Sequence, residues 1–214
     1  MNPLAVKDQS VERLGLYGGS FDPVHNGHLL VARAALEELA LDRLFLIPAA
    51  RSPFKPAQVP TPPAVRARLL RLAFAGWNRC QLDLQEIERG GVSYTIDTLR
   101  AYRRRHPAAR LFYLIGADHL ASLPQWREAE ALAEVAEFVV VPRPGESVTA
   151  VPAAFRIRQL TGFPLALSAS QIRERVQQGR PIDHLAPPAV TEAIRNNGLY
   201  LRADLPHPDG DGFA

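Results

Sequence analysis

Residues 14–30 decide the fold of this chain, and they read Leu14-Gly15-Leu16-Tyr17-Gly18-Gly19-Ser20-Phe21-Asp22-Pro23-Val24-His25-Asn26-Gly27-His28-Leu29-Leu30. The run from Leu14 to Tyr17 has no polar alternation, which is typical of a strand buried on both faces. Gly18 and Gly19 are expected to end the strand, because glycine permits a positive φ and a close approach of the backbone. From Leu29 the apolar residues recur with helical spacing. The stretch therefore predicts a strand, a glycine turn, a loop and a helix.

Two histidines lie at the expected start of this helix. His25 and His28 are three residues apart, so both imidazoles can point the same way, and Gly27 leaves space for a ligand between them. The N–H groups and the dipole of a helix N-terminus favour an anion. Because imidazole titrates near pH ~6.5, a bound phosphate can hold it protonated. We predict a phosphate site; a metal site with Asp22 as a further ligand and a purely structural pair are the alternatives.

Size and composition indicate one domain in a reducing compartment. The 214 residues can bury a large core, and Cys80 as the single cysteine excludes an internal disulfide. No apolar run of about 18 residues and no signal-peptide pattern is present, so we expect a cytoplasmic protein without a membrane partner. The net charge is +3 and the basic residues are spread along the chain. We therefore expect no nucleic-acid partner, since Arg103-Arg104-Arg105 ends a predicted helix, where cations complement the dipole.

Strand and helix patterns alternate along the rest of the chain. Buried strands are expected over residues 43–48, 111–118 and 137–141, and an edge strand over 81–88. The strand at 137–141 is expected to end in a turn at 142–145, and a less regular segment is expected from there to residue 164. Helices are expected over 27–40, 62–76, 95–105, from 119, over 167–179 and over 187–197. Arg66, Arg68 and Arg71 are expected to point mostly outward. This order predicts an α/β fold with a doubly wound, Rossmann-like parallel sheet flanked by helices and a small C-terminal helical subdomain.

The division of this domain follows from the same pattern. Residues 1–165 are expected to form the Rossmann-like core, with a loose opening segment at 1–12. Residues 166–202 are expected to be a C-terminal helical segment that completes the same domain. Residues 203–214 are rich in Pro, Gly and Asp and are expected to form a disordered tail.

A proline-rich loop follows the strand expected at 43–48. Its Lys55 is one of only two lysines in a chain that otherwise uses arginine, and the loop lies at the sheet edge where such folds bind ligands. We predict that Lys55 contacts a phosphate; the alternative is a solvated lysine in a connecting loop.

Three further motifs follow at the ends of later elements. After a glycine turn, the helix expected at Thr95 has N–H groups that could hold a carboxylate, and Tyr94 could lie against an aromatic ring; alternatively, Ser93 and Thr95 only cap this helix. Gly116 and Asp118 end the strand expected beside the first one, or Asp118 caps the next helix. Ser168, Ser170 and Arg173 could hold a second phosphate group, or form an N-cap with a surface arginine.

Residues 18–28 resemble the G-x-F-D-P-x-H-x-G-H signature of nucleotidyltransferases with the H-x-G-H motif. From about Arg13 to Leu201 the chain resembles one branch of them, the bacterial nicotinate-mononucleotide adenylyltransferases. Residues 88–99 are similar to the E-R-x-G-x-S-Y-T-x-D-T-L pattern of that family, and residues 167–173 to its I-S-S-T-x-I-R pattern. Three positions depart from it: Phe54 replaces a histidine, Ala169 replaces a hydroxyl residue, and Ala129 lies where a second aromatic residue often follows Trp126.

The resemblance implies transfer of AMP from ATP to nicotinate mononucleotide, giving nicotinate adenine dinucleotide and pyrophosphate for NAD biosynthesis without a covalent intermediate. It implies Mg²⁺ held mainly by the ATP phosphates, with no protein metal ligand. The catalytic residues would be His25, His28, Lys55 and Arg173. The ATP-binding and phosphate-binding residues would be Gly18, Gly19, Ser20, Phe21, Gly27, Gly116, Asp118, Ser168 and Ser170. The mononucleotide would bind Tyr94, Thr95 and Trp126, although a lone tryptophan is more often part of a core.

Two kinds of alternative remain at this point. The chain could serve another branch of the superfamily, acting on nicotinamide mononucleotide, phosphopantetheine, or a choline- or glycerol-phosphate substrate. It could also be a non-catalytic nucleotide-sensing module that has kept the phosphate cradle. The expected partners are the small-molecule substrates ATP and nicotinate mononucleotide, and a homo-oligomer is compatible with the sequence.

Overall fold

A computed structural model describes residues 11–54, 59–142, 152–163 and 165–201 of the chain. Within these residues, one sheet has the strand order β3-β2-β1-β4-β5-β6. The strands are β1 (Arg13–Gly19), β2 (Arg43–Pro48), β3 (Cys80–Leu82), β4 (Arg110–Gly116), β5 (Glu137–Val141) and β6 (Ile157–Gln159). All neighbouring strands are parallel. The predicted doubly wound, Rossmann-like sheet is confirmed, and its topological switch point lies between β1 and β4.

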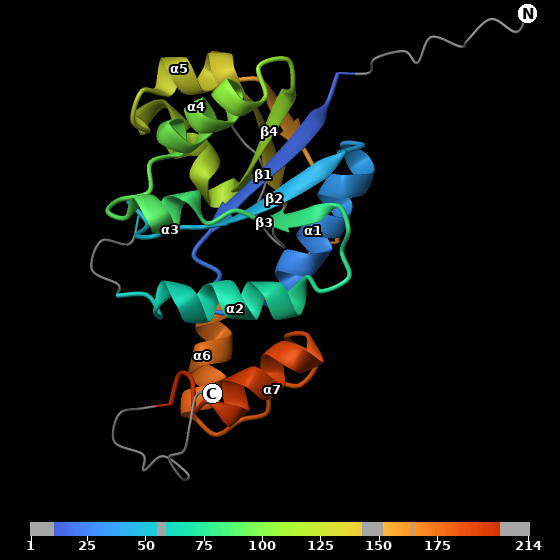
Figure 1. Cartoon of the computed structure of the whole chain (residues 1–214), viewed down its shortest axis with the longest axis vertical. Helices are drawn as coiled ribbons and strands as arrows, with labels where there is room; N and C mark the ends of the chain where they lie inside the picture. Colours follow the sequence, from blue (N-terminus) through green and yellow to red (C-terminus); the bar gives the residue numbers. More distant parts are fainter. Residues whose placement is uncertain (1–10, 55–58, 143–151, 164, 202–214) are drawn as a thin grey trace, which may run out of the picture.

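Helices cover both faces of this sheet (Figure 1). They are α1 (Asn26–Glu38), α2 (Pro63–Ala73), α3 (Gln85–Arg89), α4 (Thr95–Arg105), α5 (Ala129–Val135), α6 (Ala169–Gln177) and α7 (Pro188–Asn196), with a 3₁₀ helix at Ala117–Gln125. One core contains buried side chains of α1, α2, α6 and α7, and the other those of α4, α5 and the 3₁₀ helix. The sheet therefore has a core on each face, and the ends of its strands are held between two layers of helices.

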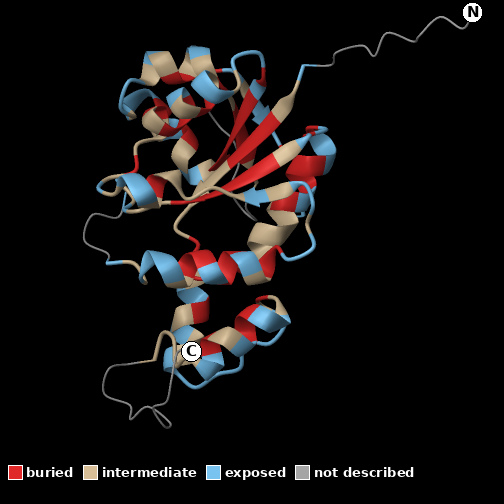
Figure 2. Ribbon diagram, viewed as in Figure 1, coloured by how far each residue is buried: buried red, intermediate tan, exposed pale blue. Residues whose placement is uncertain are grey.

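Successive residues of the central strands point into opposite cores. In β2, Leu44 and Leu46 belong to the core with α1 and α2, whereas Phe45 and Ile47 belong to the core with α4. Figure 2 shows the strands as largely buried and the outer faces of the helices as exposed. Burial of both faces explains why these strands read as continuous apolar runs.

The C-terminal helices extend the first core. Ile172 of α6 and Val190 and Ile194 of α7 are at most 1% exposed, and they share a core with Leu69 and Leu70 of α2. In Figure 1, α6 and α7 lie on the side of α2 away from the sheet. The domain boundaries at residues 165 and 202 stay a prediction.

Two segments differ from the prediction. Residues 81–88 were expected to be one edge strand, but β3 ends at Leu82 and α3 begins at Gln85. The Asp83 carboxylate accepts a hydrogen bond from the Gln85 N–H at 2.9 Å, a local bond that turns the chain and ends the strand. The segment expected to be irregular up to residue 164 contains β6, which pairs with β5.

Arg66 also differs from the prediction. Its side chain was expected to point outward, as arginine side chains usually do, but it is 0% exposed. Arg66 precedes Leu69 and Leu70 by three and four residues, so it shares their buried helix face. Hydrogen bonds to the carbonyls of Ser20 and Thr61 compensate the buried guanidinium.

Some predictions concern residues outside the described ranges: Lys55, the opening residues 1–10, the turn at 143–145 and the tail at 203–214. Among the helices that are described, none has the length and apolar character needed to cross a membrane.

Candidate active site

The carboxyl ends of the strands border a cavity of about 540 Å³. Its walls come from the segments after β1, β2, β4, β5 and β6 and from the first turns of α1, α4 and α6. Open α/β sheets bind ligands at this edge, and small-molecule sites measure about 300–1,000 Å³. Every predicted site residue that the structure describes, except Tyr94, lines this cavity.

Gly18 and Gly19 provide space at the end of β1. We predicted a positive φ at these glycines, but β1 continues through Gly19, and the positive φ falls on Phe21, at 47°. A Cβ on Gly18 would lie 2.6 Å from the hydroxyl oxygen of Tyr113, and one on Gly19 would lie 3.2 Å from the Phe21 ring. Close contact with aromatic side chains, and not backbone conformation, therefore requires glycine here.

His25 and His28 face each other at the start of α1. Their ring centroids are 3.8 Å apart, and a Cβ on Gly27 would lie 3.0 Å from the His25 ring. The His25 backbone N–H donates to His28 Nδ1 at 3.1 Å. A neutral imidazole that accepts at Nδ1 has its proton on Nε2. This geometry leaves Nε2 as the ring nitrogen from which His28 can donate to a ligand. That a bound phosphate holds the imidazole protonated stays a prediction.

Asp22 and Arg66 fix the loop between β1 and α1. The Asp22 carboxylate is buried and accepts hydrogen bonds from the Thr61 N–H at 3.0 Å and the Tyr200 hydroxyl at 2.9 Å. Arg66 donates to the carbonyls of Ser20 and Thr61, both at 2.8 Å. Burial lowers the pKa of Arg66, and the charge of Asp22 opposes that shift. Two segments far from this loop in the sequence, residues 61–66 and Tyr200, thus hold it in place.

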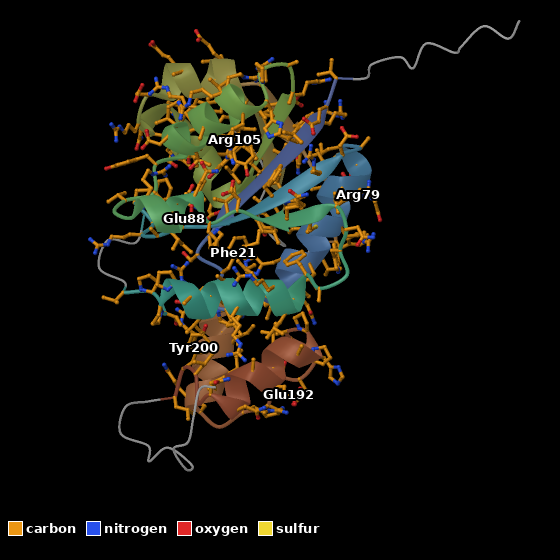
Figure 3. The ribbon with its side chains drawn as sticks, in the orientation of Figure 1. Phe21, Arg79, Glu88, Arg105, Glu192 and Tyr200 are labelled. Carbon is orange, nitrogen blue, oxygen red and sulfur yellow. The ribbon has the colours of Figure 1, made fainter. Side chains whose placement is uncertain are left out.

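Figure 3 labels Phe21, which belongs to this loop, and Tyr200, which donates to the loop residue Asp22. Phe21 lies on the sheet side of α2, and Tyr200 lies on the opposite side, with the C-terminal helices. Burial raises the pKa of Tyr200, and the nearby charge of Asp22 raises it further, so its hydroxyl stays protonated and can donate.

Arg173 connects α6 to the same loop. Its Nη1 donates to the carbonyl of Asp22 at 2.7 Å, and its Nη2 donates to Ser170 Oγ at 3.1 Å. A guanidinium has five N–H donors, so these two bonds leave capacity for ligand oxygens. Ser168 is the N-cap of α6, and its Oγ accepts from the Gln171 N–H at 3.3 Å. The capping alternative is therefore confirmed for Ser168.

The end of β4 forms the opposite wall of the switch point. Gly116 is the N-cap of the 3₁₀ helix Ala117–Gln125, which has no side-chain cap, so the alternative in which Asp118 caps this helix is wrong. Asp118 lines the cavity, and its carboxylate lies 3.9 Å from His119 Nε2. A carboxylate at this edge of the sheet can accept hydrogen bonds from sugar hydroxyls.

The first turn of α4 forms the wall beyond β2. Its N-cap is Tyr94, which makes no side-chain cap. Ser93 Oγ instead accepts from the Ala50 N–H at 2.9 Å, and Thr95 Oγ1 donates to the Tyr113 hydroxyl at 3.3 Å. The alternative in which Ser93 and Thr95 only cap the helix is therefore wrong. The α4 N-terminus has no side-chain carboxylate or hydroxyl as a cap, which suits a ligand carboxylate.

Glu86 is a buried carboxyl in the same wall, and no sequence pattern had indicated it. It lines the cavity, is 4% exposed and accepts a hydrogen bond from Thr98 Oγ1 at 2.6 Å. Burial raises the pKa of Glu86, although hydrogen bonds from Thr98 and Ser93 act in the opposite direction. Its position could not be predicted because residues 81–88 were expected to form one edge strand, whereas Glu86 lies in the first turn of α3.

Trp126 contributes an aromatic face to the cavity, but Tyr94 does not. Trp126 Nε1 donates to Ser122 Oγ at 3.2 Å, and its ring packs edge-on against Phe138 with centroids 6.3 Å apart. The Tyr94 ring instead lies 4.7 Å from the guanidinium carbon of Arg127. The structure therefore corrects the predicted position of Tyr94.

The cavity walls do not fit a metal ion held by the protein alone. No group of three or more His, Cys, Asp or Glu side chains that could hold a metal occurs in the described part of the chain. Both oxygens of Asp22 already accept hydrogen bonds. A divalent cation here would take its ligands mainly from substrate phosphates and water.

Comparisons with known proteins agree with this architecture. The family model described as cytidylyltransferase-like matches residues 16–175. A protein of Opitutus terrae named "probable nicotinate-nucleotide adenylyltransferase" is 39% identical, over 88% of this chain and 97% of its own length. A Thermus thermophilus protein with the same name is 42% identical, over 88% of this chain and 99% of its own length.

Solved structures show the same fold. A Plasmodium falciparum nicotinic acid mononucleotide adenylyltransferase complexed with NaAD superposes with a TM-score of 0.70 and 17% identity, covering 88% of this chain and 97% of that one. The family match and the identity to full-length relatives establish that this chain belongs to the cytidylyltransferase-like family and, within it, to the nicotinate-nucleotide adenylyltransferases.

Proposed function

We propose that this chain transfers the adenylyl group of ATP to nicotinate mononucleotide, forming nicotinate adenine dinucleotide and pyrophosphate for NAD biosynthesis. The observation that supports this most is one cavity whose walls include both the paired histidines at the start of α1 and the Trp126 ring. The names of the full-length relatives support the acid as substrate and not the amide.

The chemistry depends on alignment and on neutralising charge. The phosphate of the mononucleotide is anionic at pH 7, since its second pKa is about 6, so it needs no general base. One of its oxygens attacks the α-phosphorus of ATP in line. The bond from that phosphorus to the bridging oxygen of the β-phosphate breaks, and its electron pair leaves with pyrophosphate. No covalent bond to the chain is formed.

Each phosphate group has candidate donors in the cavity wall. His28 Nε2, His25 and the first N–H groups of α1 donate to the oxygens around the α-phosphorus. Arg173 holds the departing pyrophosphate, with Ser170 beside it. Lys55, which lies outside the described residues, is expected from the sequence alone to contact the same group. Mg²⁺ held by the phosphates would neutralise part of their charge. Because Arg66, Asp22 and Tyr200 fix the loop before His25, these donors are held in place before the substrate binds.

The remaining walls position the two nucleosides. Gly116 and Asp118 lie where a ribose can be bound, on the β4 side of the switch point. The N-terminus of α4, with Thr95, faces the nicotinate carboxylate, and Trp126 stacks on the pyridine ring. The helix dipole favours the carboxylate over the neutral amide by roughly 1 kcal/mol, and direct hydrogen bonds add to this preference.

Pyrophosphate release with two nucleotides tests this proposal. At saturating Mg-ATP, we expect turnover with nicotinate mononucleotide at least about 5-fold above that with nicotinamide mononucleotide, the ratio that ~1 kcal/mol gives. Faster turnover with phosphopantetheine, choline phosphate or glycerol phosphate would show that the chain has the activity of another branch of the superfamily. Binding of ATP without pyrophosphate release from any pair would identify the nucleotide-sensing alternative.

A further inference from the structure

Phe54 lies against the face of Trp126 at one end of the cavity. The ring centroids are 5.1 Å apart with an interplanar angle of 41°, and Phe54 also contacts the His119 ring at 4.7 Å. All three rings line the cavity. Phe54 is 46% exposed, so its ring is open to the cavity in spite of these two ring contacts. An exposed aromatic ring in a cavity wall is typical of a binding surface.

We propose that Phe54 is the second wall of the slot that holds the pyridine ring, with Trp126 as the first, and that it determines affinity for the mononucleotide. This inference rests on the proposed function. The ring nitrogen of the substrate is bonded to ribose, so the ring is a pyridinium cation. Aromatic faces attract cations and pack against flat rings, and two such faces suit a pyridinium better than one.

The two walls are supported in different ways. Trp126 is held by the bond from its Nε1 to Ser122 Oγ and by its contact with Phe138. The loop that positions Phe54 is fixed at its base, because the Ala49 N–H donates to the Gly19 carbonyl and the Ala50 N–H to Ser93 Oγ, both at 2.9 Å. Trp126 is thus a fixed wall, and Phe54 is an exposed ring on an anchored loop.

No third ring fits between Phe54 and Trp126 as they stand. Aromatic pairs in contact have centroids about 4.5–7 Å apart, and these two are separated by 5.1 Å. An arriving pyridinium therefore takes the place of Phe54 on Trp126, and Phe54 covers its outer face. If Phe54 only blocked the slot, its removal would tighten binding, so the two roles predict effects of opposite sign.

Fluorescence of Trp126 reports on this slot directly. The chain has two tryptophans, and the other, Trp77, packs against Arg33 outside the cavity. In a Trp77→Phe background, we expect nicotinate mononucleotide to quench Trp126. Phe54→Ala should raise the Kd about 10-fold, which corresponds to ~1.4 kcal/mol. Phe54→Tyr should stay within about 2-fold of the parent, because it keeps the ring, whereas Phe54→Leu should resemble Phe54→Ala.

Phe163→Ala is the matched control. Phe163 is 52% exposed and lines the same cavity, but it follows β6, which three strands separate from β2. We expect it to leave the Kd of the mononucleotide unchanged, and Phe54→Ala to leave the KM for ATP unchanged. An unchanged or lower Kd in Phe54→Ala overturns the inference while the proposed function stands. A parent protein that neither quenches nor releases pyrophosphate with the mononucleotide overturns both.

Discussion

The phosphate end and the pyridine end of the cavity are built in different ways. At the phosphate end, Phe21, Asp22 and His25 are 2%, 4% and 5% exposed. Their loop is held by side chains from α2 and from the C-terminal segment. At the pyridine end, Phe54 is 46% exposed, and its ring contacts are to other rings of the wall.

This difference matches the two tasks of the site. Transition-state stabilisation requires donors that are already in place, because reorganising them during the reaction would cost free energy. Recognition of a flat cationic ring requires aromatic faces, whose position can adjust as the ring arrives. We therefore expect substitutions at the phosphate end to lower kcat or stability, and substitutions of the side chains that face the pyridine ring to change affinity and substrate preference.

Removing His28 should have the largest effect. His28→Ala should lower kcat about 10²–10³-fold, or ~3–4 kcal/mol, if the ring donates chiefly in the transition state. His184→Asn is the control, since the His184 side chain is exposed and its φ of 63° is tolerated by asparagine. Steady-state pyrophosphate release measures both. A loss of only a few-fold in His28→Ala would remove the distinction between the two ends.

Removing Arg66 should mainly lower stability. Arg66→Met leaves the carbonyls of Ser20 and Thr61 without their buried donor, at about 1–3 kcal/mol each. We expect a loss of roughly 3 kcal/mol in the free energy of unfolding, measured by urea denaturation. Arg68→Met, on the exposed side of the same helix, should change it by less than about 0.5 kcal/mol. Equal effects of the two variants would show that the buried guanidinium does not fix the loop.

Tyr200→Phe tests how far the C-terminal segment supports the phosphate end. It removes the hydroxyl that donates to Asp22 at 2.9 Å, and bonds to charged groups contribute roughly 1.5–3 kcal/mol. We expect a lower Tm and a fall in kcat smaller than that of His28→Ala, with the KM for nicotinate mononucleotide nearly unchanged. A large rise in that KM with no change in kcat would show that Tyr200 supports binding of the mononucleotide and not the phosphate end.

Thr95→Val should act on substrate preference alone. Loss of the hydroxyl at the α4 N-terminus should reduce the ratio of kcat/KM for the acid to that for the amide about 5-fold, or ~1 kcal/mol. Thr95→Ser keeps the hydroxyl and should keep the ratio. If Val lowers turnover of both nucleotides equally, this end of the cavity does not read the carboxylate.

Replacing the buried Glu86 should have the smallest effect, a small change in Tm. Its raised pKa means that the folded protein binds the proton more tightly than the unfolded chain does. This carboxyl therefore favours folding below its ordinary pKa of 4.5, and that contribution is lost as the pH rises through its folded pKa. Glu86→Gln should raise Tm at pH 8 by about 1–2 °C, as ~0.5 kcal/mol does in a domain of this size, and by less at pH 4. A Tm difference independent of pH would contradict this.

At the phosphate end, the residues that face the ligand could be predicted from the sequence. The residues that hold their loop in place could not. Gly18, Gly19, His25 and His28 are close together in one segment, so their placement follows from local pattern and from the sheet edge. The support comes from bonds between residues 46 to 178 positions apart, which no local pattern indicates. Arg66 is a partial exception, because its spacing to Leu69 and Leu70 places it on the buried face, yet its charge favours the opposite interpretation.

The pyridine end could be predicted only in part. Thr95 and Trp126 line the cavity as expected, but the position of the Tyr94 ring depends on Arg127, 33 residues later in the chain. The position of Glu86 depends on where β3 ends, and a single bond from the Gln85 N–H to Asp83 decides that. Side-chain orientation in short connecting segments follows from such individual contacts, and periodicity does not determine them.

A crystal structure with nicotinate adenine dinucleotide and Mg²⁺ tests the central claim most directly. We predict that the bridging phosphates lie within hydrogen-bond distance of His28 Nε2 and the first N–H groups of α1, with the pyridine ring on Trp126. A dinucleotide bound away from the two histidine rings would contradict the assignment of the cavity and of the chemistry derived from it.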